Sequence, residues 1–418
     1  MRVSLLIQRY KLTLYLFLLV VVSISISRQL FIFSLWPWLL SWILEDKFRE
    51  KFRGNIFIRR NFPFWSLCLM FILYGLSILW SKNKSYGIKE IGQMATLIII
   101  PFFLVFSSDT FKRRESVILI FKAFILGMVI SSLHLIFVAL TKSLSFENGK
   151  ILFTPAINDW ENVFFNSNFT YLIHTSYYSM MLIMAVSVCL YDIRMKLLLK
   201  SRILIPGILS VFFSVMVFLT QSRSAFLALL AIVLYQLIIF RIRLFIKFTV
   251  FLIIVVLSII YLSNAFRFKS LKDNFSSSTD AQSALFHSNI RDTIWSSTML
   301  IIKKYPVLGV GLGDQQDELN AVYKKYNLSE AYENHLNCHN QFLQTWLSTG
   351  VVGLCVLLIS LFYPLALKNY KLKTLYASFV LLIIIMFFFE SMLERVWGIA
   401  FFSIFYTLLQ FSPEILNE

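Results

Sequence analysis

The sequence carries little charge for its length. Of its 418 residues only 15% are charged, whereas soluble globular chains carry about a quarter. Hydrophobic residues make up 58% of the chain and aromatic residues 17%, with 43 Phe. Apolar runs of about 20 residues, the length that crosses a bilayer, recur along the chain. The composition therefore excludes a soluble protein and predicts a polytopic membrane protein.

Three further absences narrow the class. Apolar stretches such as LLIIIMFFFE do not alternate with polar residues, which excludes a transmembrane β-barrel and favours an all-α fold. The cysteines lack the spacing of metal ligands and predict no disulfide framework; they are Cys68, Cys189, Cys338 and Cys355. No small-residue cleavage pattern follows the first apolar run, so we expect an uncleaved first span.

Hydropathy predicts about twelve transmembrane spans within a single integral membrane domain, residues 1–418. The spans are 12–27, 29–44, 62–80, 87–107, 117–141, 170–190, 203–220, 224–240, 248–263, 341–364, 374–390 and 396–412. The first two are short enough to form one re-entrant pair, which gives a range of eleven to thirteen.

The net charge of +17 is spread over many short connectors. Since it forms no single basic patch, it argues against a nucleic-acid partner and predicts topology instead. With the N-terminus inside, every even-numbered connector is rich in Lys and Arg. We therefore expect both termini in the cytoplasm and two long outer loops, near 142–169 and 264–340.

Arg223, in TQSRSAFLAL, falls in the predicted outer turn between spans seven and eight. One interpretation is an arginine that snorkels to the membrane surface. The other is anion binding, because the first turn of the next helix favours an anion and disfavours a cation. The hydroxyls of Ser222 and Ser224 and the guanidinium of Arg223 would then face one phosphate.

Residues 289–305 of the second outer loop predict an amphipathic helix that begins at Ser288 or Asn289 and ends before Pro306. Arg291 lies on its apolar side at helical spacing from Ile294 and Trp295. A cation–π contact with Trp295 or a snorkelling side chain is one explanation, and a second anion ligand is the other.

The glycines of GVGLGD, residues 309–314, follow that predicted helix. A dinucleotide-binding fingerprint would instead follow a strand and open a helix, so this motif does not predict a nucleotide site. A turn or a close backbone approach is the better explanation.

His339, in HNQFLQTWLSTGVVGL, lies at the start of predicted span ten with Asn337 or Asn340 as its helix cap. A histidine at a membrane interface is often structural. Its expected place on the same side as two arginines, at a helix N-terminus that favours the neutral imidazole, also suits a general base. His335 completes an HxxxH pattern, but no acidic ligand accompanies it and we predict no metal site.

These stretches, with the R…W…YPVLGVGLGD segment between them, resemble the O-antigen ligase and O-antigen polymerase superfamily of bacterial envelope glycosyltransferases over residues 203–364. HTSYYSMM at 174–181 adds a weaker match. The resemblance implies an all-α, GT-C-like membrane protein of the bacterial inner membrane with a periplasmic active site. It implies that Arg223 and Arg291, with Ser222, Ser224 and His174, bind an undecaprenyl-diphosphate-linked glycan, and that His339 activates the acceptor hydroxyl.

The resemblance further implies a reaction that needs no nucleotide, metal or other cofactor. A ligase would deliver the glycan to a lipid A core sugar, whereas a polymerase would deliver it to another lipid-linked glycan. We favour the ligase and keep the polymerase as the alternative. A transporter or flippase is the alternative of another class; it would show ionisable residues near mid-membrane and repeated halves, and neither pattern is evident.

Overall fold

The computed structural model describes residues 2–45, 62–107, 111, 113–147, 149–158, 161–196, 204–239, 290–366 and 372–411. The helices of the first half are α1 (Arg2–Ser23), α2 (Arg28–Ile43), α4 (Phe62–Ser77), α5 (Lys84–Gln93), α6 (Thr96–Val105), α8 (Arg114–Ser143), α9 (Asn166–Phe169) and α10 (Thr175–Met195). Those of the second half are α11 (Leu204–Thr220), α12 (Arg223–Ile239), α15 (Ile290–Lys304), α16 (Gln315–Lys325), α17 (Ser329–Glu333), α18 (Gln341–Ala366), α19 (Lys373–Phe389) and α20 (Val396–Phe411). The 3₁₀ helices η2 (Ile78–Trp80) and η3 (Met392–Glu394) and an antiparallel hairpin of β1 (Leu144–Glu147) and β2 (Lys150–Phe153) complete the elements.

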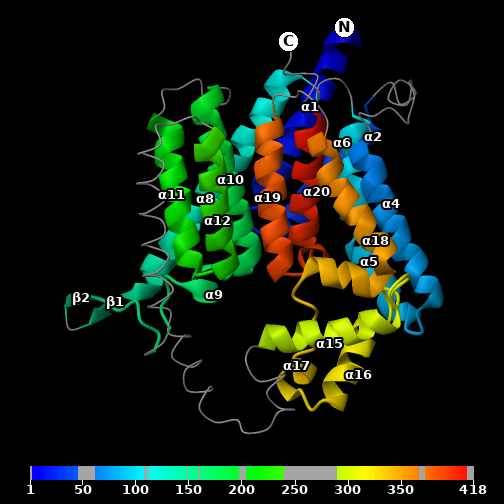
Figure 1. Ribbon diagram of the computed structural model, residues 1–418. Coiled ribbons are helices and arrows are strands. Elements are labelled where there is room, and N and C mark those ends of the chain that lie inside the picture. The colour runs from blue at the N-terminus through cyan, green and yellow to red at the C-terminus, as the bar shows by residue number, and fades with distance from the viewer. Residues whose placement is uncertain are drawn as a thin grey trace.

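The long helices form one bundle, and α15, α16 and α17 lie across one end of it (Figure 1). We call this end the site side. α1 begins and α20 ends at the opposite end, the terminal side (Figure 1). The ends of the described chain therefore lie on one side of the bundle, as the basic connectors predict.

Apolar helices account for most of the described chain. Five segments are long and apolar enough to cross a membrane, and five shorter apolar helices accompany them. The five are Phe62–Trp80, Lys84–Val105, Arg114–Ser143, Thr175–Met195 and Gln341–Ala366. This confirms a helical membrane protein, while the predicted span 248–263 and loop residues 264–289 lie outside the described residues.

Two features differ from the sequence prediction. The outer loop 142–169 contains the β1–β2 hairpin, so the fold is not purely α. The span predicted at 170–190 is α10, which begins five residues later because the imidazole of His174 caps its first turn by accepting the amide of Ser176 at 3.4 Å. A histidine at such a cap gives little sequence signal, since Ser, Thr, Asp and Asn are the usual cap residues.

The amphipathic helix predicted at 289–305 is present as α15, and Ile294, Thr298 and Ile302 are buried on one face of it. The predicted cap residues Ser288 and Asn289 lie outside the described part of the chain. After α15 the chain turns through Gly309 and Gly311, which have φ of 69° and 91°. Glycine is needed there because other residues rarely adopt positive φ.

This glycine turn packs against a break in α18. Gly350 has φ 70° and ψ −171°, which interrupts the helix. The carbonyls of Leu347 and Ser348 accept the amides of Val310 and Gly311 at 2.8 and 3.0 Å. The turn therefore takes the place of the missing helical hydrogen bonds, and the close backbone approach predicted for GVGLGD is confirmed.

Candidate functional site

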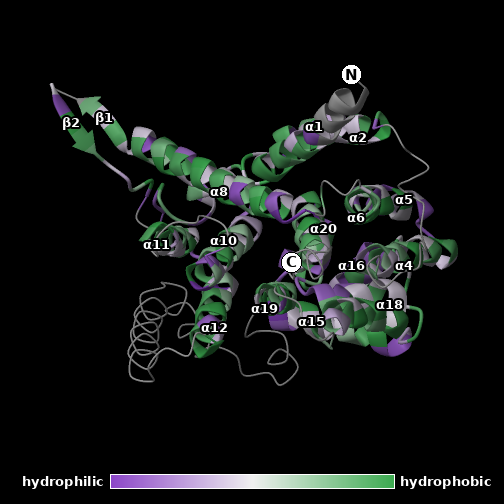
Figure 2. Ribbon diagram, turned by 90° about the horizontal axis from the view of Figure 1, so that it is seen from above, coloured by the Kyte–Doolittle hydropathy of each residue, from purple (hydrophilic) through white to green (hydrophobic). Residues whose placement is uncertain are grey.

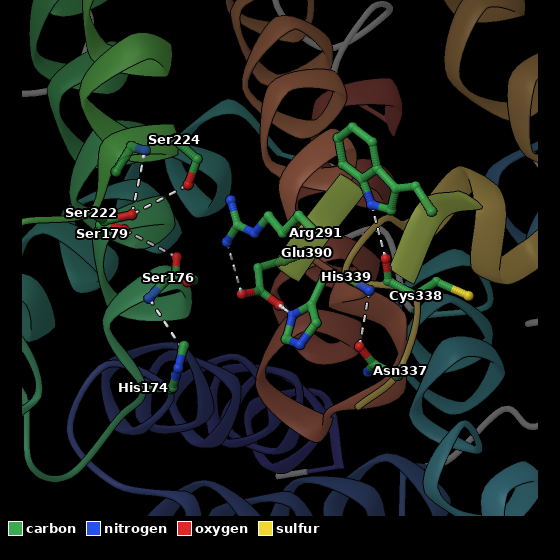
Figure 3. A network of polar contacts seen from close by, with 12 residues as sticks. His174, Ser176, Ser179, Ser222, Ser224, Arg291, Asn337, Cys338, His339 and Glu390 are labelled. Atoms are coloured by element: carbon green, nitrogen blue, oxygen red, sulfur yellow. Dashed lines mark hydrogen bonds and ion pairs between the residues drawn. The ribbon is translucent and has the colours of Figure 1, made fainter. Parts of the chain in front are cut away.

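The candidate site lies on the site side, where α15, the start of α18 and the end of α19 meet (Figure 3). Arg291, the second residue of α15, contributes the first charge. Its guanidinium lies 5.8 Å from the ring centroid of Phe389 and 3.9 Å from a carboxylate oxygen of Glu390. The side chain remains 38% exposed, so part of the guanidinium can still reach a ligand.

Glu390 connects Arg291 to His339. Its second carboxylate oxygen lies 3.1 Å from Nδ1 of His339, which is shown in Figure 3. A carboxylate at this distance favours the tautomer with the proton on Nδ1, and Nε2 is then the nitrogen that can accept a proton. Burial opposes ionisation of Glu390, but its hydrogen bond to His339 and the charges of His339, His174 and Arg291 lower its pKa.

The loop that carries His339 is held from several sides. His339 itself has φ 44°, a conformation that costs energy for a residue with a side chain and needs support from its surroundings. Its amide donates to Asn337 Oδ1 at 3.0 Å, and the indole of Trp295 donates to the carbonyl of Cys338 at 3.1 Å. Asn340 caps α18 by accepting the amides of residues 342 and 343, which confirms one of the two predicted caps.

Asn337 also connects this loop to the corner between α19 and α20. Its amide nitrogen donates to Glu394, and Gln315 Nε2 donates to the other carboxylate oxygen of Glu394 at 3.1 Å. Removal from water, reinforced by the charge of Glu90 and opposed by Asn337 and Arg395, raises the pKa of Glu394 to about 7. Burial thus makes the carboxyl of Glu394 a weaker acid than an exposed glutamate, and Asn337 links it to the loop that carries His339.

His174 stands at the start of α10, and Figure 3 places it near Glu390 and His339. Burial lowers the pKa of His174, the charge of Glu390 raises it, and the charges of His339 and Arg395 lower it further. The net direction favours a neutral imidazole. His335, by contrast, contacts Asn320 at 3.2 Å, so the two histidines of the HxxxH pattern contact different partners.

Arg223 is the first residue of α12 and is exposed. Among the described residues no ion pair or hydrogen bond of its side chain is found. Ser222 Oγ accepts the amide of Ala225 at 3.4 Å and lies 3.3 Å from Ser224 Oγ. In Figure 3 the two hydroxyls face Arg291 from the other side of the site. The structure thus connects Arg291 to His339 through Glu390, and Arg223 takes no part in these contacts.

The sequence prediction gave Glu390 and Glu394 no place in the site and considered Asn337 only as a helix cap. A signal was present, because Glu390 follows the apolar stretch of α19, residues 374–389, which contains no charged residue. An acid that ends such a span on the same side as predicted anion ligands is a candidate partner for them. Hydropathy alone could not assign it to His339, which is 51 residues away in the sequence.

Fold and site together define a polytopic helical membrane protein with a cationic and acid–base site at one end of its bundle. Residues 208–358 match the family model described as O-antigen ligase. The match contains Arg223, Arg291 and His339, and it supports the resemblance of the chain to the O-antigen ligase and polymerase superfamily. His174 and Glu390 lie outside the matched residues. No curated protein matches the chain.

Proposed function

We propose that this protein transfers a glycan from undecaprenyl diphosphate to an acceptor hydroxyl, with the acid–base site on the periplasmic face of the inner membrane. The observation that carries the proposal is the chain of contacts from Arg291 through Glu390 to His339. It joins a group suited to bind a phosphate to a group suited to take a proton, and glycosyl transfer from a lipid diphosphate needs both.

In the proposed reaction the acceptor oxygen attacks the anomeric carbon of the sugar while the bond from that carbon to the diphosphate oxygen breaks. The acceptor proton moves to Nε2 of His339, and the electron pair of the broken bond stays on the diphosphate. Arg291 and Arg223 stabilise the charge that develops there. Attack opposite the leaving group inverts the configuration at the sugar.

Burial lowers the pKa of His174 and favours its neutral form. We assign this residue to substrate binding, as a hydrogen-bonding group. Ser222 and Ser224 present hydroxyls beside the N-terminus of α12, where free amides also favour an anion. These residues would receive the diphosphate on the side of the site opposite His339. The diphosphate is already a good leaving group, so this scheme uses no nucleotide.

We favour a ligase whose acceptor is a lipid A core sugar. The residues named above all act on the donor or on a hydroxyl, so the choice between a ligase and a polymerase depends on the acceptor. A polymerase would use the same donor chemistry with a second lipid-linked glycan as its acceptor.

Reconstitution of the purified protein in vesicles with a lipid-linked glycan tests the proposal directly. One set of vesicles also contains lipid A core, and the other contains only the lipid-linked glycan. A ligase forms glycosylated lipid A core in the first set, whereas a polymerase forms longer lipid-linked glycans in both. His339→Ala should lower turnover by about 10²–10⁴-fold, the usual effect of losing a general base.

Donor binding by His339→Ala, measured on the same preparation, should change far less than its turnover. Movement of the donor across the vesicle membrane without a new glycosidic bond would instead favour a transporter. A His339→Ala variant that transfers normally, or that loses donor binding in proportion to turnover, would remove His339 from the chemical step.

A further inference from the structure

The β1–β2 hairpin has one wholly apolar face. In its antiparallel register Leu144 pairs with Phe153 and Phe146 pairs with Ile151. Since side chains alternate along a strand, these four residues share one face. All four are exposed, and Phe146 and Ile151 are 76% and 73% exposed. A two-stranded hairpin is at best marginally stable in water, so this face requires a cover.

The apolar face continues a stripe on the transmembrane helix before it. Exposed apolar residues recur along α8 at spacings of four and three, which places them on one side of the helix. They are Leu126, Ile130, Leu133, Phe137 and Leu140, and Leu144 of β1 follows at the same spacing. In a membrane protein a stripe of this kind faces lipid. The apolar surface therefore passes from the lipid-facing side of α8 into the hairpin without a break.

The position of the hairpin agrees with a lipid cover. Figures 1 and 2 show that it projects sideways from the end of α8, beyond the rest of the bundle and on the site side. Thr141 and Lys142, in the last turn of α8, are exposed and polar. Exposed polar residues of this kind are expected where a transmembrane helix ends at the membrane interface.

The chain that follows the hairpin contacts the end of α8. The amide of Thr154 donates to the carbonyl of Ser143 at 2.7 Å. Beyond α9, the hydroxyl of Tyr171 lies 2.8 Å from Nε2 of His134 on α8, and Lys142 Nζ lies 5.1 Å from the centre of its ring. These contacts hold the segment that follows the hairpin against the end of α8.

We propose that the hairpin is a membrane-surface anchor that lays Leu144, Phe146, Ile151 and Phe153 into the lipid leaflet on the site side. Aromatic and aliphatic side chains with nearby lysines are the residues that bind a lipid interface. The partner is the bilayer itself. The inference does not depend on the proposed glycosyl transfer, because lipid contact can be measured without substrate.

Photo-crosslinking of the full chain in lipid nanodiscs tests this anchor. A benzophenone amino acid replaces Phe146 or Ile151 on the apolar face, and the nanodiscs contain labelled phosphatidylethanolamine and phosphatidylglycerol. Phe137 of α8 is the positive control, and Lys150, on the opposite face of the hairpin, is the negative control. We expect lipid adducts at positions 146 and 151 that approach those at 137 and exceed those at 150 severalfold.

Equal adducts at positions 146, 151 and 150 would overturn the proposal, because the apolar face would then have no preference for lipid. So would an absence of lipid adducts at 146 and 151 in samples prepared alongside a 137 variant that reacts. An adduct to a second copy of the chain, seen as a covalent dimer, would assign the face to self-association instead. Two positions are used so that a folding defect at one does not decide the result.

Discussion

At the scale of single residues, Glu390 determines what the site can do. It contacts Arg291 with one oxygen and His339 with the other. The charge of Arg291 is thus partly balanced before any ligand arrives, and the orientation of the imidazole is set. The carboxylate of Glu390 therefore contacts both the arginine proposed to bind the diphosphate and the histidine proposed to take the acceptor proton.

Glu390→Gln should therefore separate chemistry from donor binding. The amide oxygen can still accept a hydrogen bond from Nδ1–H, but it carries no charge to stabilise the imidazolium that forms. Turnover should therefore fall about 10–100-fold. Donor affinity should stay constant or rise, because Arg291 loses a competing anion. Measurements of turnover and donor binding check this, with Glu330→Gln on the exposed surface of α17 as the control. Equal loss of both quantities would contradict it.

The two arginines should depend on their guanidinium geometry as well as on their charge. If each binds the diphosphate through a forked pair of hydrogen bonds, Arg223→Lys and Arg291→Lys should fail nearly as badly as the alanine variants, since an ammonium cannot reproduce the fork. Glycan transfer by variants that express normally is the measurement. Lys303→Ala, which removes an exposed cation from α15, is the control. Full activity of both lysine variants would show that the arginines contribute only their positive charge.

At the scale of elements, the break in α18 positions the site. Besides the bonds between residues 310–311 and 347–348, the amide of Val351 donates to the carbonyl of Pro306 at 3.0 Å. The carboxylate of Asp314 accepts the amides of Lys82 and Asn83, both at 2.8 Å. The glycine turn thus joins α15, α18 and the corner before α5, and His339 precedes the first residue of α18 by two positions.

Gly350→Ala should disrupt the junction. A side chain costs about 1–3 kcal/mol at such backbone angles, and a Cβ there would overlap the carbonyl of Val307. We expect a lower thermal midpoint of the purified protein and loss of transfer. Gly75→Ala in α4 is the matched control, because nothing lies within 4 Å of its added Cβ and alanine favours a helix by about 1 kcal/mol. An unchanged thermal midpoint for Gly350→Ala would show that the break in α18 is not required for stability.

At the scale of the whole molecule, the candidate site lies at one end of the bundle and the termini of the described chain at the other. The basic connectors predict that the site side faces the periplasm. The proposed reaction takes place in the periplasm only if the bundle has this orientation.

Cysteine labelling should establish the orientation. Ser329→Cys on α17 and Glu115→Cys at the start of α8 are both exposed and lie at opposite ends of the bundle. A membrane-impermeant maleimide should label position 329 in cells whose outer membrane alone is permeabilised, and position 115 only after the inner membrane is opened. Labelling in the reverse order would show that the site side faces the cytoplasm.

The sequence by itself determined the class of protein, a helical membrane protein, and it predicted where the spans and the polar motifs fall. Local patterns suffice for these, because the hydrophobicity of each 20-residue window sets whether it enters a membrane and the nearby cations set its direction. α15, the cap at Asn340 and the glycine turn were predictable for the same reason. The family resemblance likewise rests on contiguous stretches of residues 208–358.

Only the tertiary structure decided which polar groups meet. Glu390 reaches His339 because the end of α19 packs beside the start of α18, and Asn337 reaches Glu394 across the same corner. Such contacts depend on how helices pack against each other, which hydropathy does not encode. The hairpin was missed for a related reason: it lies in the predicted outer loop 142–169, and hydropathy does not encode which residues of a loop pair as strands.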